Sequence, residues 1–101
     1  MKVPVAALKS AWDALPGVDK TALKTAKDNI ETFHAAQQPQ SLEVETMSGV
    51  MCRRAPRPID SAGLYVPGGS APLVSTLMML AVPAKRAGVD KRIVVTPPNS
   101  A

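Results

Sequence analysis

The sequence predicts an α/β protein, because three patterns follow one another along its 101 residues. Two apolar stripes at helical spacing come first, and an apolar–polar alternation with a glycine turn comes second. A strand, a glycine-rich turn, a helix and another strand complete the order. These patterns predict a helical hairpin in residues 1–38, a β-hairpin with an extended connection in residues 39–61, and one βαβ unit in residues 62–101.

The first segment is expected to form two antiparallel helices. Pro4 suits the first turn of a helix, and Pro16-Gly17 ends that helix with a tight turn. Asp19 is placed to cap the second helix, which continues to about Gln37. Apolar residues mark one face of each helix: Val5, Leu8, Trp12 and Leu15, then Leu23, Ala26, Ile30 and Phe33. Each stripe is too narrow for a complete core, so we expect the pair to pack on another element.

The middle segment is expected to form a β-hairpin. Leu42–Thr46 alternates apolar and polar residues, as a half-buried strand does. Gly49 turns the chain, and Val50–Arg54 returns as the second strand. Pro56 and Pro58 then make an extended connection, because each proline also restricts the residue before it.

The last segment is expected to form a parallel strand pair with a crossover helix. Ala62–Val66 and Ile93–Val95 are the candidate buried strands. The helix between them is apolar nearly all round, which is typical of a helix buried on several sides. Pro83 is expected to kink this helix near its end, and Gly88 closes it.

The turn Pro67-Gly68-Gly69-Ser70 joins the first of these strands to the helix. Ser70 suits the N-cap and Pro72 the first helical turn. A parallel sheet needs cover on both faces, and one βαβ unit covers only one. The segment therefore predicts an incomplete, nucleotide-binding-type parallel sheet, a partial dinucleotide-binding-like domain that opens a larger α/β protein.

The glycine turn has two interpretations. A glycine turn leading into a helix N-terminus binds anions readily, because free N–H groups and the helix dipole point at the same place. Pro-Gly-Gly-Ser matches neither the dinucleotide fingerprint nor a P-loop, so the alternative is a simple turn. Tyr65, just before the turn, either packs on the neighbouring helix or lays its ring against a nicotinamide or adenine.

The residues available for catalysis are few. His34, the single histidine, is expected to be a surface or capping residue, and Cys52, the single cysteine, a buried or incidental thiol. A metal site needs three or four donors, and the scattered carboxylates do not complete such a set. The sequence therefore predicts no metal site and no complete active site.

Composition bounds the class of protein. A hydrophobic fraction of 46% with a mean hydropathy near zero indicates a globular chain. A single cysteine excludes an intrachain disulfide and fits a reducing compartment. The longest apolar run, residues 71–84, is broken by polar residues and is too short for a spanning helix. We expect a cytoplasmic protein with no membrane partner.

A net charge of +4 indicates a nucleic-acid partner only where the basic side chains are clustered. The lysines are spread along the predicted helices, and only Arg53, Arg54 and Arg57 lie close together. We therefore expect no nucleic-acid partner, and a small basic nucleic-acid-binding protein stays as a third interpretation.

One long stretch resembles a known family. Residues 57–89, RPIDSAGLYVPGGSAPLVSTLMMLAVPAKRAGV, are similar to histidinol dehydrogenase, and GLYVPGGSAPL is the most specific part. KDNIETFHAAQ (27–37), VET (44–46) and IVVTPP (93–98) also resemble the N-terminal part of that family. The resemblance runs from about Val18 to the end of the chain.

This resemblance implies an enzyme of histidine biosynthesis that oxidises L-histidinol to L-histidine through the aldehyde. Family members reduce two NAD in succession, hold one zinc per active site and form intertwined homodimers. Their zinc ligands and acid–base pair lie beyond the position of Ala101, so no catalytic or metal residue carries over. Tyr65 matches a tyrosine that contacts NAD in the family, so the resemblance implies that Tyr65 is a cofactor-binding residue. We also predict that Pro67, Gly68 and Gly69 bind the cofactor, because a glycine turn at a helix N-terminus binds anions.

The leading interpretation is thus the N-terminal section of a histidinol dehydrogenase-like protein. By itself the chain is expected to be inactive and to bind neither NAD nor zinc tightly, because a pocket must be largely formed before binding. Histidinol would be a substrate only of a complete protein. The second interpretation is a truncated binding module that dimerises through Leu73, Leu77 and Leu80.

Overall fold

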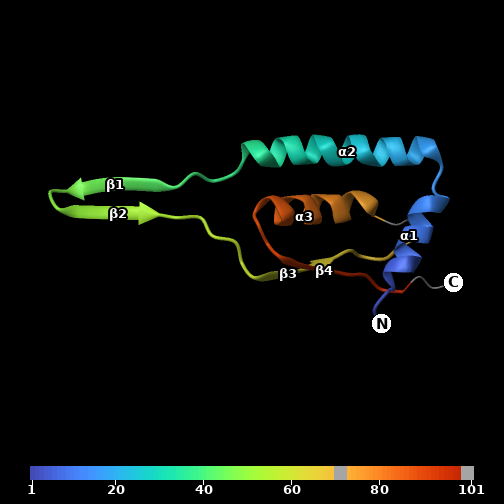
Figure 1. Cartoon of the computed structure of the whole chain (residues 1–101). Helices are drawn as coiled ribbons and strands as arrows, with labels where there is room; N and C mark the ends of the chain where they lie inside the picture. The colour runs from blue at the N-terminus through green and yellow to red at the C-terminus, as the bar shows by residue number, and fades with distance from the viewer. Residues whose placement is uncertain (70–72, 99–101) are drawn as a thin grey trace.

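A computed structural model describes residues 1–69 and 73–98 (Figure 1). The elements, in chain order, are α1 (Val5–Ala14), α2 (Gly17–Ala36), β1 (Leu42–Met47), β2 (Val50–Arg54), β3 (Ser61–Tyr65), α3 (Val74–Arg86) and β4 (Lys91–Val95). Their order and type confirm the α/β prediction. The predicted helix cap Ser70 and helix residue Pro72 lie outside the described residues.

Three layers form the body of the molecule. Helix α3 lies between α2 on one side and the β3–β4 sheet on the other (Figure 1). The buried hydrophobic residues, Leu64, Val82 and Val89, all belong to this body. Three residues of the apolar stripe on α2 are half-buried in this body: Leu23, Ala26 and Ile30. The stripe of α2 therefore packs on α3, the crossover helix.

An ion-pair group supplements the packing of α2 on α3. The Glu31 carboxylate accepts a hydrogen bond from Lys27 Nζ at 3.1 Å, and its other oxygen lies 4.0 Å from Arg86 Nη1 of α3. The hydrogen bond and the charge of Lys27 hold the pKa of Glu31 below its ordinary value. The Lys27 and Glu31 side chains are 49% and 35% exposed, so solvent screens this pair and it adds little to stability.

Strands β3 and β4 pair in parallel, with Gly63 opposite Ile93 and Tyr65 opposite Val95. The parallel βαβ unit is therefore confirmed. The prediction that both strands are buried is wrong. In β4, Ile93, Val94 and Val95 are 47–52% exposed. In β3 only Leu64 is buried. Among the described residues only α3 covers the sheet, and it covers one face.

The two N-terminal helices lie where the sequence predicts them, but they do not pack face to face. Within the described residues α1 packs on no other helix or strand, and it turns away from α2 at their junction (Figure 1). Lys20 bridges that junction, because its Nζ donates to the backbone carbonyl of Asp13 at 3.0 Å. The predicted cap Asp19 is wrong, since α2 already begins at Gly17 and Asp19 lies in its first turn.

The β1–β2 hairpin projects from the body as an arm (Figure 1). Gly49 turns the chain with φ +78°, as predicted, and its N–H donates to Glu45 Oε1 at 2.8 Å. No other described element packs on the hairpin. The molecule is consequently long, with extents of 66 × 30 × 25 Å.

Helix α3 runs on through Pro83 to Arg86. Gly88 ends it with φ +84°, as predicted, and its N–H donates to the carbonyl of Lys85 at 3.1 Å. None of the helices in the described part of the chain is long and apolar enough to span a membrane.

Candidate functional site

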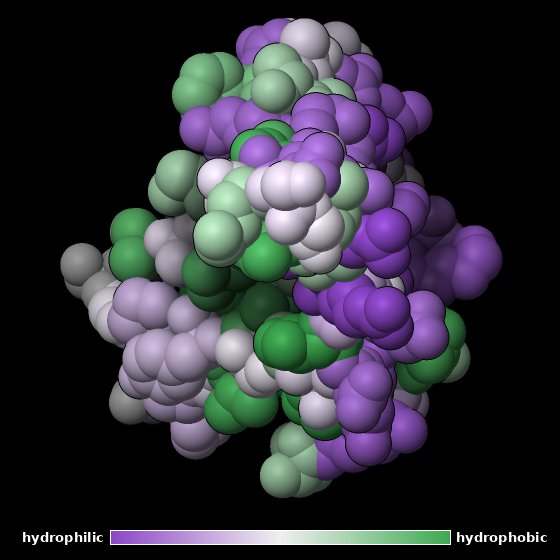
Figure 2. Space-filling model, turned by 90° about the vertical axis from the view of Figure 1, so that its left-hand side faces the viewer, coloured by the Kyte–Doolittle hydropathy of each residue, from purple (hydrophilic) through white to green (hydrophobic). Residues whose placement is uncertain are grey.

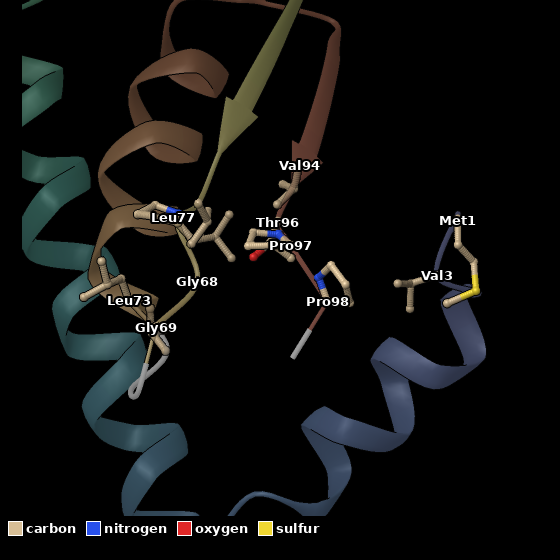
Figure 3. A pocket seen from close by; sticks show the side chains of 13 residues that line it. Met1, Val3, Gly68, Gly69, Leu73, Leu77, Val94, Thr96, Pro97 and Pro98 are labelled. Carbon is tan, nitrogen blue, oxygen red and sulfur yellow. The ribbon is translucent and has the colours of Figure 1, made fainter. Parts of the chain in front are cut away.

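The predicted turn forms one wall of a hollow of about 540 Å³. The turn follows β3, and the N–H of Val66 donates to the carbonyl of Val95 at 2.9 Å, which continues the strand pairing up to the turn. Figure 3 shows the hollow between the turn, the start of α3, the end of β4 and the N-terminal residues. Its lining consists of Met1, Val3, Val66, Pro67, Gly68, Gly69, Leu73, Val74, Leu77, Val94, Thr96, Pro97 and Pro98.

The hollow lies beyond the carboxyl ends of both parallel strands. In open α/β sheets this is the place where ligands bind, because the strand ends and the following turns leave a crevice there. A volume of about 540 Å³ is within the usual range for small-molecule pockets. The site is therefore positioned as a ligand pocket is in this class of fold.

The chemistry of the hollow is mostly apolar. The walls are aliphatic side chains and prolines, and Thr96 supplies the hydroxyl. No described lining residue has a charged side chain. Polar recognition would come from the backbone of the turn and from the first N–H groups of α3, whose N-cap Leu73 provides no side-chain cap.

Position 68 needs a glycine because close packing leaves no room for a side chain, not because of its backbone conformation. A Cβ at this position would lie 2.7 Å from Pro97 Cγ, nearer than real Cβ atoms approach. Pro97 follows β4, so the turn after one strand packs directly on the segment after the other. This contact holds the two sides of the hollow together.

The structure separates Tyr65 from the other predicted site residues. Pro67, Gly68 and Gly69 line the hollow, whereas Tyr65 does not. Because Leu64 points toward α3 and is buried, Tyr65 lies on the other face of the sheet, where it is 60% exposed. It is nevertheless the last residue of β3, next to the rim of the hollow.

The remaining candidate residues lie elsewhere. His34 is half-buried on α2 and packs edge-on against Phe33, with ring centroids 5.7 Å apart. Cys52 is exposed on the hairpin, 3.7 Å from Thr46 Oγ1, so the thiol is not buried. Among the residues that the structure describes, no group of three His, Cys, Asp or Glu side chains is placed to hold a metal ion.

The arginines do not gather on one face. Arg53 pairs with Glu43 at 2.8 Å, and Arg54, its neighbour on β2, points to the opposite face of the hairpin. Arg57 lies at the base of the hairpin beside Pro56 and Pro58. This arrangement offers no continuous basic surface along the arm.

Comparison with known proteins identifies the family. A sequence model described as histidinol dehydrogenase matches residues 1–101. The chain belongs to the histidinol dehydrogenase family. The resemblance carried by GLYVPGGSAPL is thereby confirmed.

Individual histidinol dehydrogenases agree with this assignment. The enzyme of Vibrio parahaemolyticus is 50% identical over 98 residues, which are 97% of this chain and 23% of that protein. The enzyme of Mannheimia succiniciproducens is 53% identical over 91 residues, 90% of this chain and 21% of that protein. The chain thus spans less than a quarter of the length of these histidinol dehydrogenases.

A solved structure shares the fold. The crystal structure of histidinol dehydrogenase from Elizabethkingia anophelis superposes with a TM-score of 0.90 and 40% identity, over 98% of this chain and 23% of that one. Because the superposition covers 98% of this chain, it includes the projecting hairpin and α1. The elongated shape is therefore shared with a longer histidinol dehydrogenase.

Sequence reasoning missed the second side of the hollow. It named no residue after Ile93–Val95 as a site candidate, yet Thr96 and Pro97 line the site. The signal was available in principle, because parallel strands place their carboxyl ends at the same edge of the sheet. The residues after Ile93–Val95 were therefore candidates as soon as that segment was identified as a strand parallel to β3.

Proposed function

We propose that this chain supplies the N-terminal, cofactor-facing part of a histidinol dehydrogenase. The complete protein would oxidise L-histidinol to L-histidine in histidine biosynthesis, in the cytoplasm, as a homodimer. The observation that carries the proposal is the Pro67-Gly68-Gly69 turn, which lines a pocket-sized hollow at the carboxyl ends of β3 and β4 in a chain of this family.

The described residues fit one side of an NAD site. The backbone of Gly68 and Gly69 and the start of α3 would bind a phosphate, and Leu77 and Val94 would pack on an apolar part of the cofactor. Tyr65, at the end of β3 beside the hollow, would contact NAD from the other face of the sheet. When bound, NAD accepts the hydride that leaves the substrate.

The described residues do not fit zinc. A zinc site uses three or four nitrogen, sulfur or oxygen ligands, and no such group is assembled within the part of the chain that the structure describes. The chain alone is consequently proposed to be inactive. The direct test supplies histidinol, NAD and zinc to the isolated chain and follows NADH absorbance. No formation above background is expected, and clear turnover would contradict the proposal.

The cofactor role is tested in a complete enzyme. The 98 matching residues of the Vibrio parahaemolyticus relative are replaced with those of this chain, and Tyr65→Ala is compared with Phe33→Ala. Phe33 is similarly exposed, at 63%, but lies on α2 away from the hollow. Tyr65→Ala should raise the KM for NAD roughly tenfold, the loss of one moderate contact, and leave the KM for histidinol nearly unchanged. An unaltered KM for NAD in Tyr65→Ala would refute the cofactor role.

A further inference from the structure

The pairing of β3 with β4 stops where the hollow begins. Alternate residues of β4 carry the hydrogen bonds of this parallel ladder. At its start the N–H of Lys91 donates to the carbonyl of Asp60 at 3.3 Å, and at its end the carbonyl of Val95 accepts from Val66 at 2.9 Å. The next position in this alternation, two residues beyond Val95, would donate to the carbonyl of Val66. Pro97 occupies that position and has no N–H, so the ladder cannot continue through it.

The ring of Pro97 takes the place of the missing hydrogen bond. A Cβ on Gly68 would lie 2.7 Å from Pro97 Cγ, so the ring lies directly against the backbone of the turn. Figure 3 shows Pro97, after the end of β4, on the side of the hollow that faces this turn. The φ of Gly68 is not positive, so the ring alone excludes a side chain there. One residue therefore ends the pairing and supports the turn.

The interrupted ladder leaves backbone groups of the turn available to a ligand. In a continued parallel ladder the N–H of Gly68 would donate to the carbonyl of Pro97. Within the part of the chain that the structure describes, the bond from Val66 to Val95 is the last between the two segments. The N–H of Gly68 is consequently not used by the sheet, and it lies at the wall of the hollow, where an anion can accept from it.

We infer that Pro97 is a positioning residue for the cofactor, because its ring fixes the backbone of the turn at Gly68 in the conformation that receives a phosphate of NAD. Pro97 acts through Gly68 and does not itself supply a polar group. The inference deepens the proposed function, on which it rests, by adding to the turn a support from a segment about thirty residues later in the chain.

The first test uses the hybrid enzyme in which residues of this chain replace the 98 matching residues of the Vibrio parahaemolyticus relative. Pro97→Ala removes the ring and restores an N–H that can pair with the carbonyl of Val66. The Kd for NAD, measured by isothermal titration calorimetry, should rise roughly tenfold, within the range of couplings between residues in contact. The KM for NAD should rise with it, and the KM for histidinol should stay within about twofold. An unchanged Kd for NAD overturns the inference.

Pro58→Ala is the matched control. Pro58 also borders a glycine, since a Cβ on Gly88 would lie 3.6 Å from Pro58 Cγ. The connection between β2 and β3, which carries Pro58, lies at the hairpin end of the body, the end turned toward the viewer in Figure 2. The hollow lies at the other end, beside the two chain termini (Figure 1). Pro58→Ala should change the Kd for NAD by less than about twofold. A loss equal to that of Pro97→Ala would overturn the inference.

A double variant isolates the contact between Pro97 and Gly68. Gly68→Ala alone places a Cβ against Pro97 Cγ and should weaken NAD binding. Pro97→Ala removes Cγ and keeps Pro97 Cβ, which lies 3.8 Å from the added atom, an ordinary van der Waals distance. Adding Gly68→Ala to Pro97→Ala should therefore change the Kd for NAD by less than about twofold. Losses that simply multiply in the double variant would contradict an action through this contact.

Thermal unfolding of the same variants separates positioning from stability. A positioning role predicts that the two substitutions are coupled in the Kd for NAD. Coupling in the unfolding midpoint without coupling in the Kd would make Pro97 a structural residue only and overturn the inference. A hybrid that binds no NAD before any substitution refutes the proposed function and the inference with it. A hybrid that binds NAD equally well with and without Pro97 refutes the inference alone.

Discussion

At the scale of single residues, glycines that look alike in the sequence have different physical roles. Gly49 and Gly88 adopt φ +78° and +84°, conformations that other residues reach only with strain. Their positions after a strand and after a helix made both roles predictable. Gly68 is different, because its lack of a side chain allows contact with Pro97. That contact joins distant parts of the sequence, and no local pattern reports it.

Replacing Gly68 should therefore destabilise the chain more than replacing a glycine in open space. Gly68→Ala is expected to cost about 1–3 kcal/mol, the usual range for overpacking, since the Pro97 ring has to move. Gly63→Ala is the control, because a Cβ there meets nothing within 4 Å. It should be neutral or stabilising by up to about 1 kcal/mol. Urea denaturation followed by circular dichroism measures both, and equal midpoints would contradict the packing argument.

At the scale of elements, periodicity identified the helices and strands but not every partner. The α2 stripe was predicted from Leu23, Ala26, Ile30 and Phe33 as one face. In the structure Ile30 is half-buried in the layer against α3, whereas Phe33 is 63% exposed. Spacing along a helix tells which residues share a face. How far the neighbouring element extends along that face depends on the tertiary packing.

Two truncations on this stripe should accordingly differ. Ile30→Ala is expected to cost about 1–2 kcal/mol, less than a fully buried isoleucine because Ile30 is only half-buried. Phe33→Ala removes a larger side chain but should cost less than about 0.5 kcal/mol, as exposed substitutions do. Thermal and urea unfolding of the two variants provide the comparison. A larger loss for Phe33→Ala would mean that this end of α2 is covered in solution.

At the scale of the whole molecule, the chain is an extended body with a small core. Its Cα radius of gyration is 18.7 Å, whereas a compact chain of this length has about 13 Å. The hairpin accounts for much of the length, since it projects from the body and packs on no other described element. Such a shape limits how much surface folding can bury.

The urea dependence of unfolding should reflect this limited burial. An unfolded chain of 10.6 kDa exposes about 15,400 Å². Folding to 8288 Å² therefore buries about 7,100 Å², where a compact domain would bury about 9,900 Å². Because the m-value scales with the area exposed on unfolding, it should be about seven-tenths of that of a compact domain of equal length. A full-sized m-value would show that the arm folds back or that the chain associates.

Local sequence patterns were enough to predict the order and type of the elements, the glycine turn of the hairpin and the glycine that ends α3, and a family motif was enough to predict the family. These features are local, because capping, turn conformation and periodicity act over a few neighbouring residues. Three arrangements were visible only in the folded chain: α2 packs on α3, α1 turns away, and Tyr65 lies on the sheet face away from α3 and does not line the hollow. These arrangements depend on which surfaces meet across distant parts of the chain. The exposure of β4 has the same origin, since an apolar strand is buried only where another element covers it.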